Sequence, residues 1–315
     1  MNKVAYLILS STLDFSTDYV CVEMKTRELN YLRLNRDQFA EYVVEYKDDS
    51  LCVIMDEEKY LVTPESLKSV FFRSPVFIRS NKPYSLEKQL YRSQWSSFIR
   101  NLTVFSDARW LNHPMSTYQA ENKVYQLDLA KRVGLKVPET VITNDSNYLI
   151  DSKTYIVKAL DTPLFYEAGQ EMFTYSTAAT GAEIKASSLR MAPVIIQECV
   201  EDKVDLRVTV VGNRVFPAFI TKNGHGIYGD WRKTPKEELQ YNKASIPHDI
   251  EEKLLLLMKK LNLSFGGIDL MLRGNDYYFV EINPTGEWGW IEASVRYDIH
   301  EAIVDWMVNG YAESD

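Results

Sequence analysis

Residues 268–283 read IDLMLRGNDYYFVEIN, and this stretch decides the fold. Two apolar, strand-like runs flank the dipeptide Gly274-Asn275, which is a strong β-hairpin signal. The runs contain three oxygen donors, Asp269, Glu281 and Asn283, and the last two share one face of their strand because they are two residues apart. Such groups are costly to bury unless something binds them, and carboxylate and amide oxygens suit a hard cation such as Mg²⁺. The hairpin therefore predicts a metal site, with solvated residues on an exposed sheet face as the alternative.

The length of the turn bears on this metal site. A strict two-residue turn would pair Arg273 with Asp276, so that Asp269 would face Val280 and Glu281 would point to the opposite face. If Asp269 and Glu281 share a metal, we expect an odd loop, most simply residues 274–276 with a bulge. A two-residue turn would count against the shared site.

Before this hairpin the chain alternates strand and helix patterns and then becomes antiparallel. The N-terminal part has a β-α-β start and a long amphipathic helix near its end. We expect strands at 4–9, 29–34, 51–55, 59–62, 137–143, 155–160, 194–200, 206–211, 214–220, 268–272 and 277–282. We expect helices at 14–28, 85–104, 248–261 and 299–308. Another helix is expected to start near Thr117, after a linker at 112–116 and an S-x-x-Q capping box, and to end at Gly134.

Three cations are candidates for binding an anion, and the case is strongest for Lys158. Lys158 lies in the strand-like run Tyr-Ile-Val-Lys-Ala-Leu, where an ammonium is rare unless it meets an anion such as phosphate. Lys123 lies in the helix, where a surface lysine is the default. Arg207 shares a strand face with Thr209 and could grip a carboxylate or phosphoryl oxygen, although a salt bridge to an acid such as Glu198 is the simpler interpretation.

A glycine pattern at residues 224–229 matches G-x-G-x-x-G, the dinucleotide-binding fingerprint. It follows the second strand of a hairpin and leads into Asp230-Trp231-Arg232 rather than into a helix, so we interpret it as a loop able to close over a ligand. The sequence contains no Walker A, H-E-x-x-H or G-x-S-x-G motif, which argues against P-loop, zincin and serine-hydrolase functions.

Composition adds further limits. The 315 residues predict about two domains, and the net charge of −8 argues against broad nucleic-acid binding. Three cysteines lie far apart, which favours reduced thiols in a cytoplasmic protein over a disulfide framework or a thiolate zinc site. The apolar run at the N-terminus is only about seven residues long, too short to span a membrane.

Taken together, these motifs resemble the ATP-grasp superfamily. The features that carry the resemblance are the two lysines, a Gln-Glu-x-Val hinge at 197–200, Asp205-Leu-Arg207, Gly-Asp-Trp-Arg at 229–232 and the hairpin acids. The segments at 120–123, 133–138, 143–145 and 281–292 look more closely like the microviridin-type peptide ligases, also called graspetide synthetases. The resemblance is strong over 110–295 and weaker before it, where residues 71–75 are similar to an aromatic-Arg-Pro segment of that family.

The resemblance implies an α/β (α+β) ATP-grasp fold. It divides the chain into an N-terminal α/β domain at 1–111, a central lobe at 112–197 and a C-terminal lobe with the metal site at 198–315. Lys123 and Lys158 would bind the phosphates of ATP, Glu198, Cys199 and Val200 would face the adenine, and Asp205 would contact the nucleotide. Asp269, Glu281 and Asn283 would hold Mg²⁺, Arg232 would approach the γ-phosphate and Arg207 would orient the acyl phosphate. Residues 166–180 depart from the glycine-rich loop of many ATP-grasp enzymes.

The implied activity is ATP-dependent macrocyclisation of a ribosomally made precursor peptide with leader and core. Asp or Glu side chains would become acyl phosphates and be joined to Ser or Thr hydroxyls as esters or to Lys amines as amides. Two alternatives stay open: an ATP-grasp ligase acting on a small molecule or a protein C-terminus, and a nucleotide-binding regulator without ligase chemistry. No nucleic-acid or membrane partner is expected, and a homodimer stays open.

Overall fold

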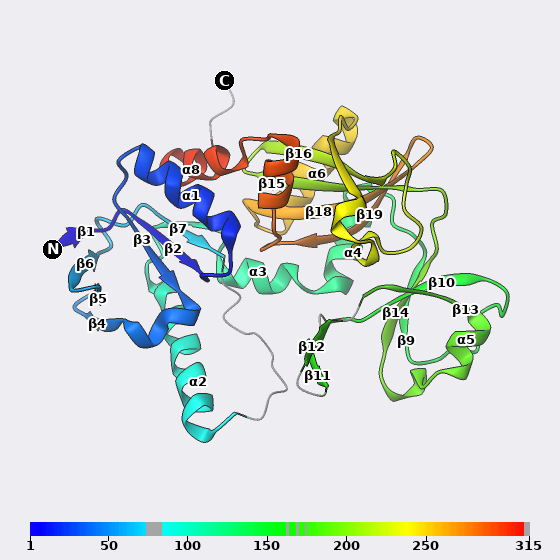
Figure 1. Ribbon diagram of the computed structural model, residues 1–315, viewed down its shortest axis with the longest axis horizontal. Helices are drawn as coiled ribbons and strands as arrows, with labels where there is room; N and C mark the ends of the chain where they lie inside the picture. The colour runs from blue at the N-terminus through cyan, green and yellow to red at the C-terminus, as the bar shows by residue number, and fades with distance from the viewer. Residues whose placement is uncertain (74–83, 162–163, 168–169, 174, 312–315) are drawn as a thin grey trace.

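The computed structural model describes residues 1–73, 84–161, 164–167, 170–173 and 175–311. The N-terminal part (blue to cyan in Figure 1) contains a parallel sheet of order β3-β2-β7-β8 and a second sheet of order β1-β6-β5-β4. The strands are β1 (Asn2–Lys3), β2 (Tyr6–Ser10), β3 (Tyr31–Asn35), β4 (Val43–Lys47), β5 (Ser50–Met55), β6 (Glu58–Val62), β7 (Ser69–Phe72) and β8 (Arg109–Leu111). The helices are α1 (Phe15–Thr26) and α2 (Leu86–Asn101). The expected β-α-β start is confirmed, whereas β4, β7 and β8 were not expected.

The predicted linker and capping box are wrong. Asn112 is 1% exposed, and its amide binds the backbone of Ser264, Phe265 and Pro284, so this junction is anchored in the interior. A short helix, α3 (Pro114–Ala120), begins at Pro114 itself, because proline is favoured at the first helical position. The expected single helix is divided here, since Asn122 accepts a hydrogen bond from the Tyr125 amide and caps a second helix, α4 (Lys123–Arg132). Gly134 follows α4 with φ +84°, as expected of a residue after a helix end.

A small antiparallel sheet (green in Figure 1) follows, with strand order β13-β10-β14-β9. Its strands are β9 (Thr140–Thr143), β10 (Thr154–Lys158), β13 (Thr177–Thr180) and β14 (Val194–Glu198), and α5 (Gly181–Ala186) lies beside it. A separate hairpin is formed by β11 (Leu164–Glu167) and β12 (Gln170–Phe173). Of the two glycines near the predicted glycine-poor loop, Gly181 begins α5, and Gly169 lies outside the described residues.

The largest sheet is antiparallel, with strand order β17-β16-β15-β18-β19. Its strands are β15 (Val204–Val211), β16 (Arg214–Lys222), β17 (Leu239–Lys243), β18 (Phe265–Arg273) and β19 (Asp276–Asn283), and its helices are α6 (His248–Lys260), α7 (Gly289–Val295) and α8 (Ile299–Asn309). One face packs on α4 and α6 through a core that includes Leu206, Val208 and Leu254. Part of the predicted central lobe, 120–137, therefore packs on the C-terminal sheet. The domain limits at 111 and 197 stay a prediction.

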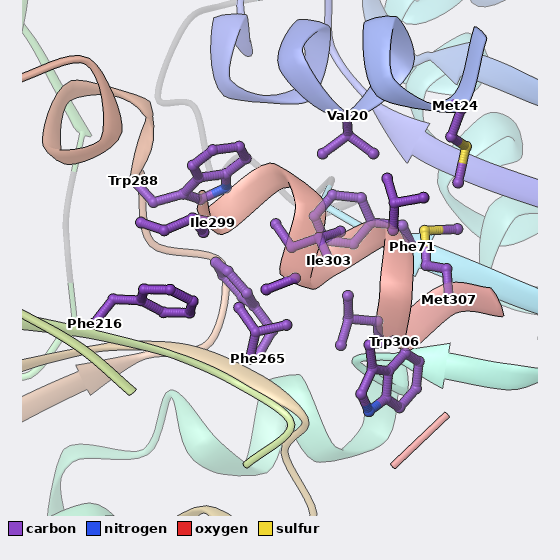
Figure 2. Packing of buried hydrophobic residues seen from close by; sticks show 14 of the residues in the cluster. Val20, Met24, Phe71, Phe216, Phe265, Trp288, Ile299, Ile303, Trp306 and Met307 are labelled. Carbon is purple, nitrogen blue, oxygen red and sulfur yellow. The ribbon is translucent and has the colours of Figure 1, made fainter. Parts of the chain in front are cut away.

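The other face joins the N-terminal part through one continuous core. Phe216 and Phe265 of the sheet meet Val20 of α1, Phe71 of β7 and Trp306 of α8 (Figure 2). Helices α1 and α8 lie side by side there (Figure 1). This packing fixes the N-terminal strand ends relative to the sheet that carries the hairpin acids. Within the described residues, no helix has the length and apolar character needed to cross a membrane.

Candidate functional site

A β-bulge brings the two hairpin acids opposite each other. The turn is the strict two-residue form that pairs Arg273 with Asp276, yet Asp269 pairs with Glu281, because Val280 is an extra residue between the pairs Leu270–Phe279 and Asp269–Glu281. The expected odd turn is therefore wrong, and the bulge lies within strand β19 instead. Because the bulge inserts one residue, every later side chain on β19 faces the side opposite to the one that regular alternation predicts. A two-residue turn therefore does not count against a shared site here.

The neighbouring strand supplies an arginine to this face. Arg207 of β15 pairs in register with Asp269, and its Nη1 donates to Asp269 Oδ1 at 2.8 Å. Both residues are 8% exposed. The simpler interpretation from the sequence, a salt bridge to a neighbouring acid, is confirmed, but the acid is Asp269 and not Glu198, which is exposed at the end of β14.

Two cations contact the other acid from different elements. Lys123 Nζ, at the start of α4, donates to Glu281 Oε2 at 2.7 Å, and Arg232 Nη1 lies 3.4 Å from Glu281 Oε1. Asp230 holds Arg232 through a 2.9 Å bond to its Nε and a 3.2 Å bond to its Nη2. Lys158 of β10 reaches the same region from the small sheet and donates to Gln197 Oε1 at 2.8 Å.

Burial and charge shift the protonation of these groups in opposite directions. Burial lowers the pKa of the Lys158 ammonium, although the nearby Glu281 opposes the shift. Burial alone would raise the pKa of Glu281, but Lys123, Arg232 and Lys158 hold it well below its usual range. Burial raises the pKa of Asp269 despite Arg207. Glu281 is therefore the firmly ionised member of the acid pair.

Two adjoining cavities lie between the small sheet and the large one. The first is lined by Glu198, Cys199 and Val200 together with apolar side chains, and by Asp205, Asp269 and Trp231. The second is lined by Lys123, Glu281 and other groups, and both cavities share Lys158 and Arg232. The base of a nucleotide could lie against the apolar side chains of the first cavity, while its phosphates would meet the cations of the second. Most of the residues predicted from the sequence thus meet in one cleft.

Asp205 lines the first cavity but already has an ionic partner, whereas Arg207 and Asn283 line neither cavity. Asp205 is 8% exposed and forms an ion pair with Lys203, and burial raises its pKa to about 6. Asn283 lies outside the two cavities, on an exposed position, and its Oδ1 accepts from the backbone and hydroxyl of Thr285.

The residues fit a magnesium ion by the chemistry of their donors. The bulge places two carboxylates directly opposite each other, and Asn283 follows Glu281 by two residues on the same strand. Both carboxylates already attract cationic side chains, Arg207 on one and Lys123 with Arg232 on the other. Mg²⁺ commonly takes a few protein oxygens and completes its shell with water and phosphate. No group of three His, Cys, Asp or Glu side chains that could hold a metal ion occurs among the described residues, so this candidate rests on two carboxylates and one amide oxygen.

Sequence reasoning missed two buried residues that position this cleft. Lys203 is 6% exposed, and besides Asp205 it binds the carbonyl of Gly229 at 3.0 Å, which ties the loop that carries Arg232 to strand β15. Gln126 is fully buried on α4 and forms a 2.8 Å bond to the Ile282 carbonyl and a 3.1 Å bond from its amide. The only signal for Gln126 in the sequence was a polar residue on the inner side of a predicted helix.

The 224–229 segment is a loop, as expected. Gly224 and Gly229 have φ +75° and +73°, and the segment leads into a single 3₁₀ turn, Trp231–Lys233, rather than an α-helix. The segment therefore lacks the strand-loop-helix setting that a dinucleotide-binding fingerprint requires. Of the aromatic-Arg-Pro segment at 71–75, residues 74 and 75 lie outside the described residues, and Arg73 is buried at the contact between the N-terminal part and the 284–288 loop.

Comparison with known proteins places this geometry in context. The sequence model of a family described as RimK-like ATP-grasp domain matches residues 120–307. No curated protein matches the chain significantly by sequence.

Solved structures of similar fold span nearly the whole chain. The macrocyclase MdnC from Microcystis aeruginosa MRC, bound with precursor peptide MdnA, has a TM-score of 0.82 at 23% identity and covers 97% of this chain and 100% of its own. A RiPP-associated ATP-grasp ligase from Chryseobacterium gregarium, in complex with ADP and a leader and core peptide, has a TM-score of 0.81 at 24% identity, covering 98% and 97%. The ATP-grasp ligase PsnB, complexed with minimal precursor, Mg and ADP, has a TM-score of 0.74 at 18% identity, covering 98% and 97%. At these identities the likeness establishes the ATP-grasp fold.

Proposed function

Since the chain belongs to the RimK-like ATP-grasp family, we propose that it is an ATP-dependent macrocyclising ligase acting on a ribosomally made precursor peptide. It would activate Asp or Glu side chains of the core as acyl phosphates and join them to Ser or Thr hydroxyls or to Lys amines. The three relatives of similar fold, each solved with its precursor or with leader and core peptides, support this substrate class.

The observation that carries the proposal is the cross-strand pair of carboxylates, Asp269 and Glu281, opposite the cations of a cleft between two sheets. A triphosphate needs several cations, and a divalent ion needs oxygen donors beside them. Lys123, Lys158 and Arg232 supply the first, and the acid pair with Asn283 would supply the second.

The residues would divide the work as follows. Lys123 and Lys158, which line the second cavity, would bind phosphate oxygens, and the segment at 198–200, which lines the first, would contact the adenine with Asp205 beside it. Asp269, Glu281 and Asn283 would hold Mg²⁺, which when bound neutralises phosphate charge. Arg232 approaches the γ-phosphate, and Arg207 orients the acyl phosphate.

The reaction then balances in two steps. A peptide carboxylate oxygen attacks the γ-phosphorus, the bond to the β-phosphate oxygen breaks, and ADP leaves. A hydroxyl or amine of the same peptide next attacks the acyl carbon, loses its proton, and releases phosphate. Fixed cations around the transferred group stabilise the charge that develops, and removing one such donor typically costs roughly 10²- to 10³-fold in rate.

The test is peptide-dependent ADP release by the purified protein, with a precursor peptide encoded beside its gene. We expect the peptide to lose the mass of one water per bond, and Asp269→Ala or Glu281→Ala to abolish both signals. Asp276→Ala, at the other end of β19 and paired with Lys136, is the matched control that should keep both. Turnover of ATP with free amino acids and none with peptide would replace the proposal with a small-molecule ligase. Tight nucleotide binding that never yields ADP would replace it with a regulator.

The cytoplasmic location belongs to the same proposal. It is supported by Cys21, Cys52 and Cys199, which are free thiols in the described part of the chain. A homodimer stays a prediction.

A further inference from the structure

Two glycines leave room for the guanidinium of Arg207. A Cβ added at Gly267, on β18, would lie 2.9 Å from Arg207 Cζ and 3.1 Å from its Nε. A Cβ added at Gly286, in the loop after β19, would lie 3.2 Å from Nη2 of the same side chain. Neither glycine has a backbone φ in the left-handed region, so at Gly267 a side chain is opposed by the arginine and not by the backbone conformation. At Gly286 a Cβ would also lie 3.3 Å from the Asn283 carbonyl oxygen and 3.4 Å from Asn283 Cβ, within the turn that the Gly286 amide closes on Asn283.

Few polar contacts hold this guanidinium in place. The hydrogen bond from Nη1 to Asp269 fixes one corner, while Nε is buried and has no hydrogen-bond partner among the described residues. The remaining constraint is steric, because the planar group lies between two stretches of bare backbone at Gly267 and Gly286.

The second glycine is itself held by the N-terminal part. Arg73 Nη1 donates to the Gly286 carbonyl at 3.0 Å, and the Gly286 amide donates to the Asn283 carbonyl at 3.2 Å. The Arg73 side chain is 1% exposed and pairs with Asp14 at 3.0 Å. The space that holds the Arg207 guanidinium, which we call its seat, is thus bounded by Gly267 of β18 and Gly286 of the loop after β19. The N-terminal part holds this loop in place through Arg73.

We propose that Gly267 and Gly286 are positioning residues that seat the Arg207 guanidinium for its work on the acyl phosphate. This inference rests on the proposed function, in which Arg207 contacts the reacting group. A guanidinium is effective only where its planar fork meets the transferred oxygens, and a displacement of about 1 Å can cost roughly 10²-fold in rate.

The variant Gly267→Ala tests the seat, with Gly266→Ala as its matched control. Gly266 is the preceding residue on β18, and a Cβ there would point to the opposite face, 3.0 Å from Ile282 Cδ1 and 3.4 Å from Met258 Sδ. We expect Gly267→Ala to lower kcat for peptide-dependent ADP release about 10²-fold and to leave the Kd for ADP within about twofold. Gly266→Ala should lower Tm and keep kcat. An unchanged kcat in Gly267→Ala would overturn the proposal.

A second readout does not depend on activity. In a background with Arg207→Ala and Asp269→Asn, which removes both members of the ion pair, an added Cβ at Gly267 meets no guanidinium. Gly267→Ala should therefore lower Tm by several degrees in the native background and not in this one, whereas Gly266→Ala should lower Tm equally in both. If Gly267→Ala lowered Tm equally in both backgrounds, the proposal that Gly267 positions Arg207 would be overturned.

Two further results separate the possible failures. If Gly267→Ala does not fold, Gly286→Ala, with its milder 3.2 Å approach to Arg207, is measured in the same two backgrounds. Its contacts with Asn283 are present in both, so its loss of Tm should be larger in the native background, and equal losses would overturn the proposal. If the native protein shows no peptide-dependent ADP release, the proposed function fails. The comparison of Tm between the two backgrounds still shows whether Gly267 positions the Arg207 side chain.

Discussion

Replacing Glu281 by glutamine separates two effects of one carboxylate. Glu281 forms contacts with Lys123 at 2.7 Å and Arg232 at 3.4 Å, the same cations that would bind phosphate. Without a metal, the carboxylate therefore competes with the nucleotide for these cations. Glutamine keeps the shape and removes the charge, so ADP should bind more tightly in the absence of Mg²⁺. The increase in affinity that Mg²⁺ produces should be lost, because one of its carboxylate donors is gone.

The magnitude follows from the exposure of the three side chains. Lys123 and Glu281 are 22% and 21% exposed and Arg232 is 42% exposed, so each contact lies between a surface ion pair and a buried one. Two such contacts are together worth about 1–2 kcal/mol. At 1.4 kcal/mol per factor of ten, metal-free ADP should bind roughly 5- to 30-fold more tightly to Glu281→Gln. The pKa of Glu281 is held well below its usual range, so this gain should not vary between about pH 6 and 8.

Isothermal titration of ADP into both proteins, once with EDTA and once with Mg²⁺, measures the effect. The control is Asp276→Asn on the same strand, whose carboxylate pairs with Lys136 at 2.5 Å on the surface and lines neither cavity. It should leave both affinities unchanged. Weaker binding of metal-free ADP by Glu281→Gln, or a full response to Mg²⁺, would refute the reasoning.

Three further perturbations have definite expected outcomes. Arg73→Met leaves the buried Asp14 carboxylate without its cation and should cost about 3–5 kcal/mol of unfolding free energy near pH 7, measured with urea. Burial opposes ionisation of Asp14, and Arg73 holds its pKa below 3.8, so the native protein loses this stability only as pH falls below that value. In Arg73→Met the Asp14 pKa should rise, so the cost should be smaller at pH 5 than at pH 8; an equal cost would contradict this account. Deleting the bulge residue Val280 should keep the fold by circular dichroism, since Asp269 still meets Glu281, whereas deleting Tyr278 should unfold the sheet by turning the buried Phe279 outward. Lys158→Met should leave Tm unchanged or higher and weaken ATP binding roughly 10- to 100-fold in titrations, because a desolvated cation is removed; unchanged ATP affinity would exclude the phosphate role.

Periodicity predicted which side chains share a face, and long-range contacts decided how they meet. The alternation along 206–210 correctly separated Arg207 from its apolar neighbours, because side chains on a strand alternate strictly. The bulge at Val280 was not predictable, since valine is favoured in regular strands and no glycine marks the site. The break before Lys123 had a local signal, the capping residue Asn122, but the continuous apolar pattern on either side concealed it. The contact of Arg73 with Gly286 joins residues 213 positions apart, and no local pattern encodes it.

The arrangement of charge explains how an acidic protein can bind a polyanion. Arg207 lies against Asp269, Lys123 and Arg232 lie against Glu281, and Asp230 holds Arg232 from behind. Each cation therefore keeps a partner before any ligand arrives, which avoids the large cost of an unpaired buried charge. If phosphate binds these cationic side chains, the carboxylates lose their partners and need another positive charge beside them. Mg²⁺ is suited to supply that charge. Nucleotide and metal should thus enter as a pair, and their affinities should be coupled through the same acids by equal factors in both directions. The net charge of −8 is compatible with this binding, because the charges that exchange partners lie together in the cleft.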